Sequence, residues 1–237
     1  MNVLDIGIIL ILIMSFIVGF KTGVMRELVS FIGIIVVFII SFELKGVIGN
    51  ILCKYLPFFK FSGGIAGLPI INILIYQTIA FLLIFSLLLG IYAVALNFSK
   101  FLQKIINMTI VLWLPSKILG GIVSAIKTWS IIFVILLVIS VPLSSVDIFH
   151  DSIMVKTILN KTPILNIIAG PFTNATEDIY ELSKEIKNKD NPDKINKEAI
   201  DIMLKYNIVD KRTIMMLIVK NKIENVNNLD EVLNKYD

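Results

Sequence analysis

Long apolar runs constrain this chain more than any other feature of its sequence. A helix needs roughly 20 apolar residues to cross a bilayer, and backbone groups in lipid must be hydrogen-bonded within the protein. Four runs meet this requirement, at about 2–20, 24–44, 70–96 and 118–146. Hydrophobic residues make up 57% of the chain, more than soluble domains contain. The sequence therefore predicts an all-α membrane protein in which 1–146 is a bundle of about four transmembrane helices.

The remaining residues, 147–237, are polar and predict a small helical tail. Residues 1–170 carry 11 basic and 5 acidic residues, whereas 171–237 carry 11 and 13. Helix-start patterns occur at Asn174 with Glu177, at Asn191-Pro192, at Asp210, and at Asn228 with Glu231. The apolar content of the tail is modest, so its core is marginal alone. We expect its helices either to pack on one another or to dock on a partner or on the membrane surface.

The fourth apolar run contains a lysine, which allows two placements of the span. If the span is 118–140, Lys127 lies deep in the bilayer, where a charge costs at least about 2.5–3.5 kcal/mol and needs a partner or water. If the span is 128–146, Lys127 and Trp129 become interfacial anchors. The second placement is cheaper, and we favour it.

This placement leaves 101–126 as an interfacial or re-entrant segment, broken at Pro115 and at Gly120-Gly121. Small residues four positions apart also allow helices to approach closely, either within the bundle or between protomers. Such pairs are Gly19 with Gly23, Gly63 with Gly67, Gly120 with Ser124, and Gly121 with Ala125.

Orientation follows from basic residues in short loops, which favour the cytoplasm. Basic residues occur between the first two spans (Lys21, Arg26), between the last two (Lys100, Lys104, Lys117) and in the opposite loop (Lys45, Lys54, Lys60). The numbers of basic residues in the loops on the two sides differ little, but no basic residue precedes the first span. We therefore expect both termini outside the cytoplasm.

Enzyme motifs are missing from the sequence: it has no nucleophile elbow, zinc-binding helix, phosphate loop or convincing dinucleotide fingerprint. The single histidine lies in His150-Asp151-Ser152, which we interpret as a solvated loop because catalytic triads are rarely sequential neighbours. Cys53 is the only cysteine, so one chain cannot form a thiolate metal cluster. We expect no enzymatic activity, no metal and no cofactor. Basic residues flank apolar runs and do not form a patch, so we expect no nucleic-acid partner.

Asp5 lies near the outer end of the first span, and an acid in a membrane helix is a candidate functional residue. It is also explained as a headgroup anchor or as a favourable charge at a helix N-terminus. The second charged position is the connection from Gly19 to Leu28, a tight turn with two basic anchors and an acid, Glu27, that can pair with Arg26.

This hairpin, together with Asp5 and a later segment, resembles the colicin V production protein (CvpA) family over roughly residues 1–146. In that family a G-x-[RK]-x-G-x-x-[RK]-E segment follows the first span, matched here by Gly19, Lys21, Gly23, Arg26 and Glu27. A D-R-x-L-G-x-x-x-G-x-x-[RK]-G segment opens the last span, matched by Lys117, Leu119, Gly120 and Lys127. In the second motif Ser116 replaces the acid, and Ser124 and Thr128 replace glycines.

The resemblance implies a multi-pass protein of the bacterial inner (cytoplasmic) membrane, associated with toxin (colicin V) production or export and with envelope stress. We interpret the chain as a non-enzymatic accessory or scaffold protein whose partners, besides the lipid bilayer, are further copies of itself or other membrane proteins. The alternative is a small oligomeric channel or transporter that uses Asp5 and Lys127.

Overall fold

The computed structural model describes residues 2–60, 68–106, 113–142, 151–186, 192–223 and 229–236. The four long helices are α1 (Val3–Thr22), α2 (Val24–Tyr55), α3 (Ile71–Ile106) and α4 (Trp113–Ser140). Each contains a segment long and apolar enough to cross a membrane. The membrane-helix fold predicted from the apolar runs is therefore confirmed.

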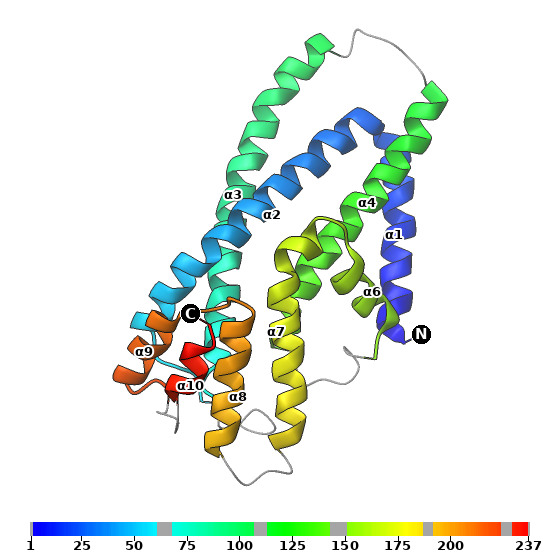
Figure 1. Ribbon diagram of the computed structural model, residues 1–237. Coiled ribbons are helices and arrows are strands. Elements are labelled where there is room, and N and C mark those ends of the chain that lie inside the picture. The colour runs from blue at the N-terminus through cyan, green and yellow to red at the C-terminus, as the bar shows by residue number, and fades with distance from the viewer. Residues whose placement is uncertain are drawn as a thin grey trace.

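The long helices are arranged as a layer. α4 packs between α1 and α2, and α2 packs in turn against α3, so the order across the layer is α1, α4, α2, α3 (Figure 1). α1 and α3 thus form the two edges. Large apolar side chains remain exposed on both, such as Met14 on α1 (67%) and Leu87 on α3 (65%). Exposure of this extent suits contact with lipid and not with water.

The break expected in the fourth apolar run is wrong. α4 is continuous from Trp113 and has no break at Gly120-Gly121. Pro115 lies in its first turn, where backbone N–H groups have no partner within the helix, so proline is tolerated there. The helix ends at Ser140, and its candidate span is Ser116–Ser140. Lys127 lies near the middle of this candidate span, which favours the placement of the lysine within the bilayer.

The tail consists of shorter helices. They are α6 (Ile153–Lys161), α7 (Leu165–Ile186), α8 (Pro192–Lys205), α9 (Lys211–Val219) and α10 (Leu229–Asn234). Pro192 and Asp210 start helices as predicted, and Asp210 Oδ1 accepts a hydrogen bond of 2.6 Å from the Thr213 N–H. Asn174 instead lies inside α7, so the cap predicted there is wrong. Asn191 and Asn228 lie outside the described residues.

The tail lies on the half of the layer that also contains the N-terminus of the chain (Figure 1). Phe42 of α2 contacts Phe172 of α7, with ring centroids 6.1 Å apart, and Phe38 extends the aromatic cluster to Phe81 and Phe133. Lys222 Nζ donates hydrogen bonds to carbonyl oxygens at the C-terminal end of α2, where the helix dipole favours a cation. The tail helices also contact one another, so the tail both packs on itself and docks on the bundle.

Candidate functional site

Two charged residues, one on α2 and one on α4, form an ion pair in the interior of the layer. Glu27 lies in the first turn of α2 and Lys127 near the middle of α4, and the Lys127 ammonium contacts the Glu27 carboxylate directly. Their side chains are only 5% and 18% exposed. Each charge offsets part of the desolvation cost of the other, which explains how α4 tolerates a lysine at this depth. The sequence allowed a pair between Glu27 and Arg26, but Arg26 is exposed and Glu27 pairs with Lys127.

Glycines beside this pair let α1 and α4 touch along their backbones. A Cβ atom on Gly120 would lie 2.6 Å from the carbonyl oxygen of Gly19 and 2.9 Å from the carbonyl carbon of Gly23. A Cβ atom on Gly19 would collide with Ser124 and with the Gly120 backbone. Gly23 has φ +89°, a conformation that favours glycine, and it makes the turn between α1 and α2. These small residues therefore serve packing within one chain, whereas Gly63 and Gly67 lie outside the described residues.

Hydroxyl groups join α1 to α4 along the same contact. Ser15 Oγ donates to the Ser124 carbonyl oxygen at 2.9 Å, and it lies 3.0 Å from Ser124 Oγ and 2.5 Å from Thr128 Oγ1. Ser124 and Thr128 are the residues that replace glycines of the family motif, and here they bond across the helix contact. Sequence reasoning missed Ser15. A single hydroxyl in a long apolar run was the only available signal.

Asp5 is fully buried at the opposite end of α1 and bridges two helix N-termini. Its Oδ2 accepts from the Asn2 N–H at 2.7 Å, while Oδ1 accepts from Ser152 Oγ at 2.5 Å and from the Met154 N–H at 2.9 Å. Ser152 Oγ also caps α6 by accepting from the Val155 N–H at 3.1 Å. A carboxylate is favoured at a helix N-terminus by the dipole and by the unpaired N–H groups. The solvated-loop interpretation is therefore wrong for Ser152, which is buried.

The candidate residues thus form two separate groups. Asp5 and Gly19 lie about 21 Å apart along α1, at 1.5 Å per residue, so Asp5 does not join the Glu27–Lys127 pair. Lys21 is exposed, and the Lys117 ammonium lies 5.9 Å from the centre of the Phe20 ring. His150 lies outside the described residues.

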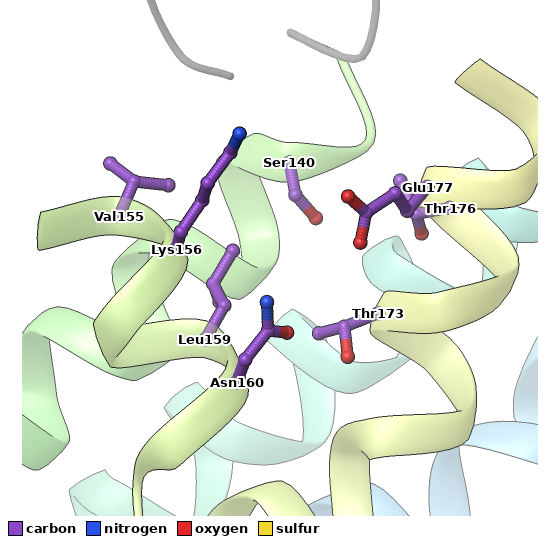
Figure 2. A pocket seen from close by; sticks show the side chains of 8 residues that line it. All are labelled: Ser140, Val155, Lys156, Leu159, Asn160, Thr173, Thr176 and Glu177. Atoms are coloured by element: carbon purple, nitrogen blue, oxygen red, sulfur yellow. The ribbon is translucent and has the colours of Figure 1, made fainter. Parts of the chain in front are cut away.

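A small pocket of about 40 Å³ lies in the tail, between α6, α7 and the end of α4 (Figure 2). It is lined by Ser140, Val155, Lys156, Leu159, Asn160, Thr173, Thr176 and Glu177. This volume suits one or a few water molecules. In the described part of the chain, no three His, Cys, Asp or Glu side chains gather as a metal site.

The family model for colicin V production protein matches residues 4–163. The chain belongs to this family. The match to the CvpA family covers the four long helices and α6, including both ends of the Asp5–Ser152 bond and both members of the ion pair. No curated protein and no solved structure matches the chain.

Proposed function

We propose that this CvpA family protein is a non-enzymatic accessory or scaffold protein of the bacterial inner membrane, which supports toxin production or export and envelope maintenance. The Glu27–Lys127 ion pair carries the proposal. A charge that serves a transport path must face water or a solute. Here the lysine and the glutamate within the layer satisfy each other and hold α2 against α4.

Asp5 supports the same interpretation. Its carboxylate oxygens accept bonds from Asn2, Ser152 and Met154, so it fixes the start of α1 to the start of α6. The docked tail then offers a folded surface at one end of the bundle, where partners can bind. Four spans put both termini on the same side of the membrane. From the basic residues of the short loops we propose that this side is outside the cytoplasm, where envelope partners are reached.

The second candidate is a small oligomeric channel or transporter that uses Asp5 and Lys127. The layered arrangement favours it, because four helices in a row enclose no path alone but can form the wall of one between protomers. In such an oligomer the Lys127 ammonium would have to leave Glu27 to meet a solute.

Removal of both charges distinguishes the two functions. A strain that lacks its own family member and carries a colicin V system would be complemented with wild type or with the Glu27→Gln/Lys127→Met double variant, and secreted toxin would be measured. A scaffold predicts equal secretion at equal membrane levels of the two proteins. Purified protein in vesicles should likewise give no proton or potassium flux above that of protein-free vesicles. If the wild-type protein gives flux and the double variant does not, the result would contradict the scaffold function and support the channel.

A further inference from the structure

The first part of the tail lies alongside the membrane helices and not beyond them. Ser152, the residue that caps the start of α6, is bonded to Asp5 in the first turn of α1. At the far end of α6, Thr162 Oγ1 accepts a hydrogen bond of 2.8 Å from the indole N–H of Trp129. The nine-residue helix therefore runs along the layer from the end of one span toward the interior of another.

The depth of this second contact follows from the position of Trp129 on α4. Trp129 precedes Ser140, the last residue of the helix, by about 16 Å at 1.5 Å per residue. Half of the hydrocarbon core is about 15 Å thick. The turn after α6 is therefore level with the middle of the α4 span.

After this turn the chain reverses direction and runs back toward the end of the layer where α6 starts. Ile164 takes φ 66°, α7 starts at Leu165, and Phe172 of α7 packs on Phe42 of α2. Figure 1 shows α7 descending next to α4, away from the centre of the layer. α6 and the first half of α7 are thus the two arms of a helical hairpin.

Lipid requires polar backbone groups to be bonded inside the protein, and two N–H groups of the turn are bonded in this way. The Leu165 N–H donates to the Pro163 carbonyl oxygen at 2.7 Å, and the Asn166 N–H donates to that of Thr162 at 3.0 Å. Thr162 itself is buried, and its hydroxyl donates to the Ile158 carbonyl oxygen at 2.5 Å.

The outward side chains of the hairpin are large and apolar. Ile153, Ile164 and Ile167 are 58%, 50% and 81% exposed. Leaving such a side chain in water instead of an apolar medium costs about 1.5–3 kcal/mol. This surface adjoins α1 and α4, with which α6 is in contact, and α1 exposes apolar side chains of its own from Val3 onward.

Polar side chains of the hairpin gather on another face. In Figure 2 the Asn160 amide and the Glu177 carboxylate point into the pocket between the two arms. A wider groove beside it is lined by Asn160, Asn166, Gly170, Pro171, Asn174, Glu177 and Tyr206. Lys161, at the end of α6, is exposed, and at this depth its ammonium requires water, which a water-filled groove supplies.

We propose that residues 152–175 form a re-entrant hairpin, inserted into the leaflet on the tail side, with Ile153, Ile164 and Ile167 in contact with lipid acyl chains. The groove behind them is the water-facing side of the hairpin. The occupant is lipid because the apolar side chains continue the outer surface of the spans at the same depth. The tail is then part of the membrane domain down to about Ala175, and the remainder is outside the bilayer.

Nitroxide labels on single cysteines test this placement in the full chain. In a Cys53→Ala background, Ile167→Cys would be labelled and reconstituted into phosphatidylethanolamine–phosphatidylglycerol vesicles, and collisions with oxygen and with a nickel chelate would be measured. Met14→Cys on α1 and Lys194→Cys on α8 are the references for lipid and water, since both side chains are mostly exposed. Because Ile167 is 81% exposed, its replacement removes little packing.

We expect the label at 167 to match the Met14 reference, with high oxygen and low nickel accessibility, and a label at 153 to report a shallower position. Nickel accessibility at 167 equal to that of the Lys194 reference would place the hairpin in water and overturn the proposal. Low accessibility to both reagents would mean that protein covers the tip, and it would overturn the lipid contact as well.

Discussion

Glu27 and Lys127 face each other across the contact between α2 and α4, and the stability of this contact depends on both partners being present. Loss of one partner of a buried pair leaves an uncompensated charge, which typically costs about 3–5 kcal/mol. Replacement of both by neutral residues of similar size is often neutral. The pair therefore tolerates removal as a unit better than removal of either member.

The single variants Glu27→Gln and Lys127→Met should each lower the free energy of unfolding in detergent by about 3 kcal/mol or more. The double variant and the exchanged pair Glu27→Lys/Lys127→Glu should recover most of this loss. Thermal unfolding followed by circular dichroism measures the four proteins. Strictly additive losses in the double variant would show that the two side chains do not interact.

Gly19 offers a second test at the residue scale, because the chain contains a matched control on the same helix. Alanine at Gly19 would collide with Ser124 and Gly120, whereas a Cβ atom on Gly7 meets nothing within 4 Å. Overpacking of this kind costs about 1–3 kcal/mol. Gly19→Ala should be destabilised by that amount and Gly7→Ala should be neutral or slightly stabilised, since alanine favours helix. Equal melting temperatures would contradict the close approach of α1 and α4.

Among the helices, α1 and α6 are joined by the carboxylate of Asp5. Asp5 accepts bonds from donors at both N-termini, so the first turns of the two helices are stabilised together. This contact also sets where the tail begins to pack on the layer. Release of α6 at this end would free the hairpin from its fixed position beside α1.

Asp5→Ala should therefore destabilise α6 in addition to α1, by about 2–3 kcal/mol, because it removes the acceptor of the Asn2 N–H and leaves the buried Ser152 hydroxyl and Met154 N–H without theirs. Hydrogen exchange in residues 153–161 should become faster. The exposed Asp230→Ala is the matched control and should leave exchange there unchanged. Unaltered exchange of α6 in Asp5→Ala would mean that the carboxylate does not hold this helix.

At the scale of the whole molecule, the sequence predicts the features that arise from short-range patterns. Apolar runs predict the spans, and Asp210 caps α9 through a residue three positions away. The Asp5–Ser152 bond joins residues 147 positions apart, and no local pattern indicates such a pairing. The cost of Lys127 within the bilayer is overestimated when its partner Glu27, a hundred residues away in the sequence, is not known. The local pattern at Asn174 predicts a cap, but α7 continues through this residue, and the packing of Phe172 on Phe42 that holds α7 there joins residues distant in the sequence.

The same long-range contacts fix which positions share a side of the membrane. Lys205 lies in the tail, and Lys127 is inside the layer. Lys21 and Lys104 lie near the C-terminal ends of α1 and α3, at the end of the layer away from the tail. Single cysteines at these positions in a Cys53-free variant, treated with a membrane-impermeant reagent, should react in intact cells only at 205. Positions 21 and 104 should react after permeabilisation, and 127 should stay protected throughout. Reaction at 21 but not at 205 in intact cells would invert the orientation and direct the search for partners to the cytoplasm, while reaction at 127 after permeabilisation would remove Lys127 from the membrane interior.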